Sequence, residues 1–135
     1  MPPKIHHLGI AVESLAEAVP VFEKLLGQKP SSQEEVADQK VRIAVFSAGE
    51  SRIELLESTT SDSPVAKFLS RRGPGIHHLT LTVPNLEQAL ADLKASGFKL
   101  VDQAPRTGAA QEKIAFLHPS STAGILIELL EEKNP

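Results

Sequence analysis

Two pairs of histidines and two glutamates are the residues of this chain whose types and spacing could do chemistry. The segment IHHLGIAV, residues 5–12, has a close copy in IHHLTLTV, residues 76–83, and the segment IELLE occurs at 53–57 and again at 127–131. Imidazole nitrogens and carboxylate oxygens together bind cations such as Zn²⁺, Co²⁺, Mn²⁺, Fe²⁺ and Ni²⁺. A carboxylate between apolar strand neighbours is costly unless a positive charge pairs with it. The pattern therefore predicts a divalent metal site.

These segments belong to an internal repeat with an offset of 71 residues. The offset aligns residues 5–29 with 76–100 and residues 42–46 with 113–117, and three extra residues in a turn then bring the two IELLE segments into register. A copy of about 55 residues is marginal as an independent fold, and two copies bury more surface by pairing. We therefore predict one domain over 1–135, with module one at 4–58, a linker helix at 59–75 and module two at 76–132.

Each module is expected to fold as a strand, a helix and three further strands. Ser14 followed by Glu17 is a capping box that begins the first helix, Asn85 caps the second, and Pro20 is expected to bend the first. Strands are expected near 29–35, 40–47 and 51–57, and near 99–103, 112–118 and 124–131. The predicted fold class is α+β, in which two tandem βαβββ modules form a curved mixed sheet around a metal-binding cleft, with helices on the outer face.

Strand alternation predicts which of the polar residues share a face. Successive side chains of a strand point to opposite faces, so His7 and His78 lie opposite the apolar residues that the helices cover. Glu54 and Glu128 each stand between apolar neighbours and fall on the same open face by the same rule. We therefore predict His7, Glu54, His78 and Glu128 as the metal ligands.

The first histidine of each pair is expected to have a packing role. His6 and His77 fall on the covered face, where an imidazole finds a backbone or other nearby partner. On the third strand of module one, alternation with the apolar residues Val41, Ile43 and Val45 places Arg42 on the open face. Arg42 is therefore a candidate for neutralising a substrate carboxylate.

Composition excludes several classes of function. The chain has 41% hydrophobic residues, 23% charged residues and a net charge of −3, without the basic excess that nucleic-acid binding requires. It has no cysteine, which excludes disulfides, thiolate catalysis and sulfur-ligated metals. Lys4 is followed by histidines rather than by the apolar stretch of a signal peptide, and no apolar run approaches a membrane span. We expect a cytoplasmic protein with no nucleic-acid or membrane partner.

The tandem modules with these ligands resemble the vicinal oxygen chelate superfamily over residues 4–132. Within it, the segments HHLGIAV, VFEKLLG, DSPVAKFL, GIHHLTLTV, KIAFLHP and GILIELLE resemble, in the same order, those of the methylmalonyl-CoA epimerase family. The resemblance implies the same four ligands, a Co²⁺ cofactor with Mn²⁺, Zn²⁺, Ni²⁺ and Fe²⁺ as alternatives, an acyl-CoA substrate and a homodimer. At the place of Glu54 some family members carry glutamine, which keeps an oxygen ligand.

The resemblance implies an isomerase that epimerises (2R)- and (2S)-methylmalonyl-CoA. The α-proton would leave and return through an enediolate that the metal stabilises. Glu128, held loosely by the metal, would be the catalytic residue on one face of the carbon, and Glu112 or a water are weak candidates for the other. Lys113 is a weak candidate, like Arg42, for contact with the substrate. The chain departs from the family at Arg42, where some epimerases have a glutamate proposed as a base, and at Ala110-Gln111, where a His-Gly pair is expected.

Two alternative functions stay open. A glyoxalase I, or lactoylglutathione lyase, uses a similar His/Glu/His/Glu quartet, although the linker STTSDSPVAKFLSRRGPG resembles that of the epimerases. A non-enzymatic member of the superfamily would hold a small molecule in the same cleft, but such a binder has no need of four ligands. The complete quartet therefore favours an enzyme.

Overall fold

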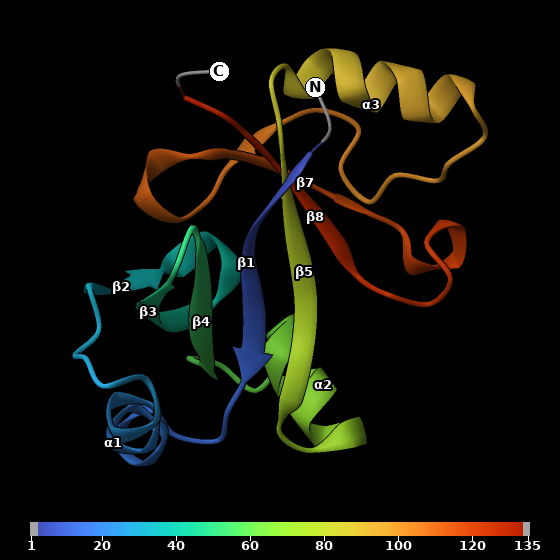
Figure 1. Ribbon diagram of the computed structural model, residues 1–135. Helices are drawn as coiled ribbons and strands as arrows, with labels where there is room; N and C mark the ends of the chain where they lie inside the picture. The colour runs from blue at the N-terminus through green and yellow to red at the C-terminus, as the bar shows by residue number, and fades with distance from the viewer. Residues whose placement is uncertain (1–2, 134–135) are drawn as a thin grey trace. The chain divides into compact units, whose positions relative to one another are not determined.

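The computed structural model describes residues 3–133 of the chain, and Figure 1 shows its helices and strands. In chain order, the elements of the first module are β1 (Lys4–Ala11), α1 (Leu15–Leu26), β2 (Ser32–Val36), the 3₁₀ turn Ala37–Gln39, β3 (Val41–Ala48) and β4 (Ser51–Ser58). The linker helix α2 (Pro64–Arg72) follows. The second module comprises β5 (Gly75–Val83), α3 (Leu86–Ala95), β6 (Arg106–Thr107), the 3₁₀ turn Ala109–Gln111, β7 (Lys113–Leu117), the 3₁₀ turn Pro119–Ser121 and β8 (Ile127–Glu131). The predicted βαβββ order is thus confirmed in both modules.

The strands and helices group into two compact units. One unit comprises residues 7–77, and the other comprises residues 3–6 together with residues 78–133. The strand order is β2-β3-β4-β1 in the first unit and β5-β8-β7-β6 in the second. In each unit the first strand pairs in parallel with the last, and the other pairs are antiparallel. The sheets are therefore mixed, and the fold class is α+β.

The core of each unit forms where its helix packs on one face of the strands. In the first unit α1 covers Ala44 and Phe46 of β3 and Leu55 of β4. In the second, α3 contributes Leu86 and Leu90 to a core with Ala115, Leu117 and Leu129 of β7 and β8. Burying an apolar side chain of this size contributes about 1.5–3 kcal/mol. The alternate strand residues consequently face the other way, and these carry the candidate ligands.

The helix ends follow the predicted capping signals. The Ser14 side chain accepts a hydrogen bond from the backbone N–H of Glu17, and the Asn85 side chain accepts one from Gln88. α1 continues through Pro20, an exposed residue that lacks the backbone N–H of the helical hydrogen-bond pattern. Among the described residues, no helix is long and apolar enough to cross a membrane.

The strand predicted at 99–103 is wrong. Only an isolated bridge between Leu100 and Leu117 forms there, and the edge strand β6 lies further along, at Arg106–Thr107. The backbone N–H groups of Val101 and Asp102 both donate to the carbonyl of Phe116, and the Asp102 carboxylate accepts from the Phe116 N–H at 2.8 Å. A side chain therefore takes the place of a backbone partner, which interrupts the ladder.

Candidate metal centre

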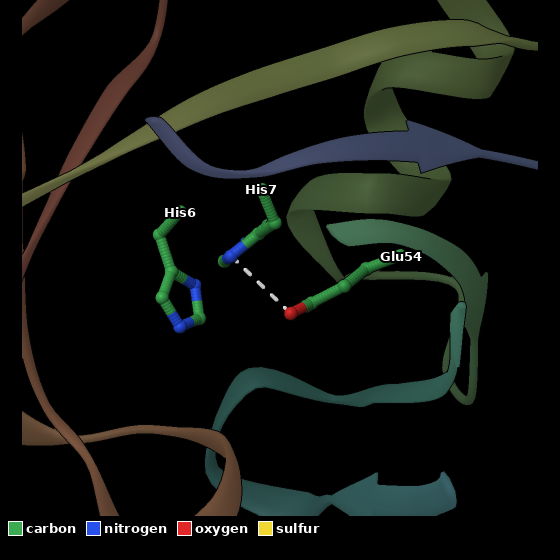
Figure 2. Close-up of side chains that lie close together, drawn as sticks. All are labelled: His6, His7 and Glu54. Carbon is green, nitrogen blue, oxygen red and sulfur yellow. Dashed lines mark ion pairs between the residues drawn. The ribbon is translucent and has the colours of Figure 1, made fainter. Parts of the chain in front are cut away.

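The first predicted ligand pair lies within the unit of residues 7–77. His7 of β1 and Glu54 of β4 are 4% and 7% exposed, and His7 Nδ1 lies 3.2 Å from Glu54 Oε2 (Figure 2). β1 and β4 are parallel neighbours, and Glu54 stands opposite Val45 of β3, on the other face from the α1 core. His7 and Glu54 are two members of a His/Glu group that is close enough to hold a cation.

The second predicted pair lies within the other unit. His78 of β5 and Glu128 of β8 are 7% and 5% exposed, and His78 Nε2 lies 3.6 Å from Glu128 Oε1. Thr80, the register partner of Glu128, donates its hydroxyl to the same oxygen at 2.5 Å. The His78 and Phe116 rings form a T-shaped pair, with centroids 5.9 Å apart. His78 and Glu128 are also two members of a potential metal-binding group.

The two pairs differ in one hydrogen bond to the carboxylate. Module one has Gly9 at the repeat position that Thr80 occupies in module two, so this position offers no hydroxyl to Glu54. A carboxylate with one oxygen fixed by a hydroxyl keeps its other oxygen in a defined direction. The Thr80 hydroxyl therefore fixes the orientation of Glu128, and the equivalent position of module one has no side chain to do the same for Glu54.

The environment of Glu128 raises the pKa of its carboxyl group to about 7. Burial is the main cause, and the negative charges of Glu112 and Asp102 add to it, whereas the Thr80 hydrogen bond and the Arg106 charge act in the opposite direction. A carboxyl with this pKa is present in both forms near neutral pH and can accept or donate a proton. A cation bound to the same carboxylate would lower the pKa.

The donor set fits a divalent transition metal. Each unit supplies one buried imidazole and one buried carboxylate that lie within ion-pair distance of each other. Imidazole nitrogen and carboxylate oxygen donors suit Zn²⁺, Co²⁺, Mn²⁺, Fe²⁺ or Ni²⁺. A cation would also offset the cost of burying the carboxylate of each pair.

The prediction that Arg42 lies on the open face is wrong. Residues 43–46 of β3 are all buried, so the strand is apolar on both faces and alternation alone does not tell which one the helix covers. Pairing with β4 places Val45 opposite Glu54 and Arg42 opposite Glu57. Because positions 54 and 57 of a strand point to opposite faces, Arg42 shares the helix-covered face with Glu57.

A basic residue, a glutamate and a helix N-terminus form the same arrangement in both modules. Glu57 accepts a hydrogen bond from the first backbone N–H of α1 at 2.6 Å, and its other oxygen lies 3.0 Å from Arg42. Glu131 accepts from the first N–H of α3 at 3.0 Å, and its other oxygen lies 3.7 Å from Lys113. A carboxylate at a helix N-terminus satisfies free N–H groups and complements the helix dipole. These contacts give Arg42 and Lys113 a structural role.

Replacing Arg42 by alanine is expected to leave KM and kcat close to those of the parent protein. The side chain is 51% exposed, so losing its ion pairs with Glu57 and Glu35 should lower the free energy of unfolding by about 1 kcal/mol or less. Steady-state kinetics and urea unfolding measure both quantities. A KM that rises far more than kcat falls would instead reveal a contact between Arg42 and the substrate.

His6 and His77 occupy equivalent positions of the repeat and have different surroundings. His77 packs edge-on against Phe68, with ring centroids 5.1 Å apart, and burial lowers its pKa to about 4. His6 Nε2 lies 3.6 Å from Glu112 Oε2, with both side chains less than one-fifth exposed at 13% and 16%. His77 thus has the packing role expected of it, whereas His6 contacts a carboxylate that strand alternation did not connect with it.

Three residues around Glu128 were not among the predicted site residues. Asp102 Oδ1 lies 3.5 Å from Arg106 Nε, and the Arg106 guanidinium stands 5.6 Å above the centre of the Phe116 ring. Phe116 is the register partner of Glu128. The sequence did not indicate a site role for Asp102 or Arg106, because both residues lie in a segment without strand alternation.

Comparison with known proteins places the chain in a family. The sequence model of the Glyoxalase/Bleomycin resistance protein/Dioxygenase superfamily matches residues 6–116. The uncharacterized protein YqjC of Bacillus subtilis is 42% identical over 130 residues, which cover 96% of this chain and 93% of YqjC.

Two solved structures are also similar. Methylmalonyl-CoA epimerase from Mycobacterium tuberculosis is 36% identical with a TM-score of 0.90, over 94% of this chain and 86% of that chain. A variant of Streptomyces coelicolor methylmalonyl-CoA epimerase in complex with 2-nitronate-propionyl-CoA is 31% identical with a TM-score of 0.90, over 97% and 95%. With the sequence match extending over most of its length, the chain belongs to the glyoxalase/bleomycin resistance protein/dioxygenase superfamily.

Proposed function

We propose that the protein is a metal-dependent epimerase that interconverts (2R)- and (2S)-methylmalonyl-CoA. The observation that carries the proposal is the environment of Glu128, a buried carboxylate with the Thr80 hydroxyl on one oxygen and the His78 imidazole beside it. A carboxylate that is oriented in this way can take up and return a proton. The relatives named methylmalonyl-CoA epimerase support the choice of an acyl-CoA with an acidic α-hydrogen as substrate.

The metal ligands in this proposal are His7, Glu54, His78 and Glu128, one imidazole and one carboxylate from each module. Their support is the repeat, which places a histidine and a glutamate at matching positions twice, and the burial of all four side chains. When bound, a divalent cation supplies a Lewis acid that stabilises the negative charge developing on the substrate thioester oxygen. Co²⁺ as the physiological metal, a homodimer and a cytoplasmic location stay predictions.

The chain's own residues provide the proton transfer. Thr80 fixes Oε1 of Glu128, so the other oxygen is the one that takes the α-proton from one face of the carbon or returns it there. Phe116 lies beside the site as the register partner of Glu128 and limits access of water to the carboxylate. Arg106 and Asp102 set the local charge that helps to tune the Glu128 pKa.

Proton exchange in heavy water tests the proposal directly. The protein with a divalent metal is incubated in one reaction with either epimer of methylmalonyl-CoA and in another with methylglyoxal and glutathione, and products are followed by proton NMR. We expect solvent deuterium to replace the α-hydrogen as the stereocentre scrambles, with no change in connectivity. A lactoylglutathione thioester in the second reaction would identify a glyoxalase I. If neither substrate changes with any of several metals, the protein is a non-enzymatic binding protein instead.

A further inference from the structure

Inversion at a carbon requires a proton donor or acceptor on each of its two faces. Glu128 serves one face in the proposed function, on which this inference rests. The repeat alone does not supply the second group, because Gly9 stands beside Glu54 at the position where Thr80 bonds Glu128. The second group is therefore to be sought where the two modules differ.

The modules differ at Glu112. The repeat offset pairs this residue with Val41, a buried core side chain that is 4% exposed. Glu112 directly precedes β7 and has extended backbone angles, so it continues the alternation of the strand. It lies two residues before Ile114 and four residues before Phe116. Since Phe116 is the register partner of Glu128, alternation places Glu112 on the face of β7 that carries Glu128. Lys113, one residue on, points to the opposite face and pairs with Glu131.

The side chain of Glu112 has a specific partner. His6 Nε2 lies 3.6 Å from Glu112 Oε2, and both side chains are mostly buried. The equivalent residue of the other module, His77, packs against Phe68. The unit that contains His78 and Glu128 therefore holds a second imidazole and a second carboxylate, those of His6 and Glu112.

The loop before Glu112 is shaped to fix the position of this residue. Its carbonyl accepts a hydrogen bond from Gly108 at 2.7 Å, and its N–H donates to Ala109 at 3.1 Å. A side chain at Gly108 would come within 2.8 Å of Ile114, so the loop packs directly on β7. Ala110 and Gln111 both have left-handed backbone angles, with φ of 55° and 61°, which non-glycine residues adopt only where the surroundings impose them.

We propose that Glu112 is the second catalytic acid/base residue and that His6 is its positioning residue. In one direction the Glu112 carboxylate takes the α-hydrogen as a proton, and the C–H bonding electrons stay on the substrate as charge delocalised toward the thioester oxygen. Protonated Glu128 then returns a proton to the opposite face. In the other direction the two glutamates exchange roles, and proton exchange with water restores the starting forms, so the reaction involves no net oxidation or reduction.

Glu112→Gln, studied with each epimer separately in heavy water, tests the proposal. We expect epimerisation to fall by about 10² to 10⁴-fold, because an amide cannot act as a general base. One epimer should still exchange its α-hydrogen for deuterium with retention of configuration, through Glu128, while the other epimer exchanges slowly. Glu128→Gln should show the mirror pattern, with the epimers reversed. A merely structural role of Glu112 would slow both epimers alike.

Three further measurements separate the possible failures. If the wild-type protein does not exchange the α-hydrogen of either epimer, the proposed function itself is refuted. If the wild type exchanges it and Glu112→Gln still epimerises at the full rate, only the role of Glu112 is refuted. Glu112→Asp, which keeps a carboxylate, should restore part of the lost exchange, and exposed Glu50→Gln should match the wild type. His6→Gln should lower kcat for the epimer that depends on Glu112 with little change in KM.

Discussion

Glu128→Gln is expected to lower the rate of epimerisation, and of α-proton exchange from the epimer that Glu128 deprotonates, by about 10² to 10⁴-fold while the protein still binds its cation. Glutamine keeps an oxygen that can coordinate a metal but has no carboxylate to accept a proton. The loss should be large because Glu128 is a buried carboxylate that the Thr80 hydroxyl holds in a fixed orientation. Deuterium incorporation by proton NMR measures the exchange, and elemental analysis measures the bound metal.

Glu54→Gln is the matched control for this substitution. Glu54 is a buried carboxylate beside a histidine, as Glu128 is, but Gly9 stands where Thr80 bonds Glu128. If Glu54 serves only as a ligand, the amide should preserve most of the activity. Equal losses in the two variants would contradict a specific proton-transfer role for Glu128, and loss of the metal from Glu128→Gln would assign its effect to ligation.

His78→Ala is expected to lose the bound cation and, with it, nearly all activity. The parent protein should carry about one divalent ion per chain, held by imidazole and carboxylate donors. Removing a buried imidazole takes away one of these donors and leaves Glu128 without the partner that lies 3.6 Å from it. Elemental analysis of the purified variant and activity with added Co²⁺, Mn²⁺, Zn²⁺, Ni²⁺ or Fe²⁺ measure the effect.

His77→Ala makes a sharp comparison because it changes the neighbouring residue in the same strand. His77 packs against Phe68 within the other unit, and burial lowers its pKa to about 4, which keeps it neutral. Its replacement should lower the free energy of unfolding by roughly 0.5–3 kcal/mol, as for a typical packed side chain, and leave the metal content unchanged. A wild-type protein that stays fully active after exhaustive chelation would contradict the metal site.

The sequence predicted the modules and the orientation of four key residues because these depend on local patterns. Strand alternation is a local property of the backbone, so each of the four predicted ligands could be assigned to the face away from the helix. The burial of all four, and the pairing of His7 with Glu54 and of His78 with Glu128 within single units, agree with that assignment. Capping residues likewise set the starts of α1 and α3 through hydrogen bonds three residues apart.

Alternation was not sufficient in β3, where both faces are apolar. The buried run at 43–46 fits a strand in either orientation, and only the register with β4 decides that Arg42 stands opposite Glu57. The prediction of an edge strand at 99–103 was wrong for a related reason. The Phe116 N–H donates to the Asp102 side chain there instead of to a backbone carbonyl. Strand pairing at these positions depends on contacts between distant parts of the chain.

Contacts between side chains distant in sequence were decided by the tertiary structure alone. His6 and Glu112 are more than 100 residues apart, and Thr80 and Glu128 are separated by 48. The internal repeat itself predicts equivalence of His6 with His77, which the structure does not preserve, because the partner of each ring comes from another segment. The sequence could thus determine which face of a strand a residue occupies. The register of the folded strands decided which carboxylate each histidine and hydroxyl meets, and hence which groups surround Glu128 and Glu112.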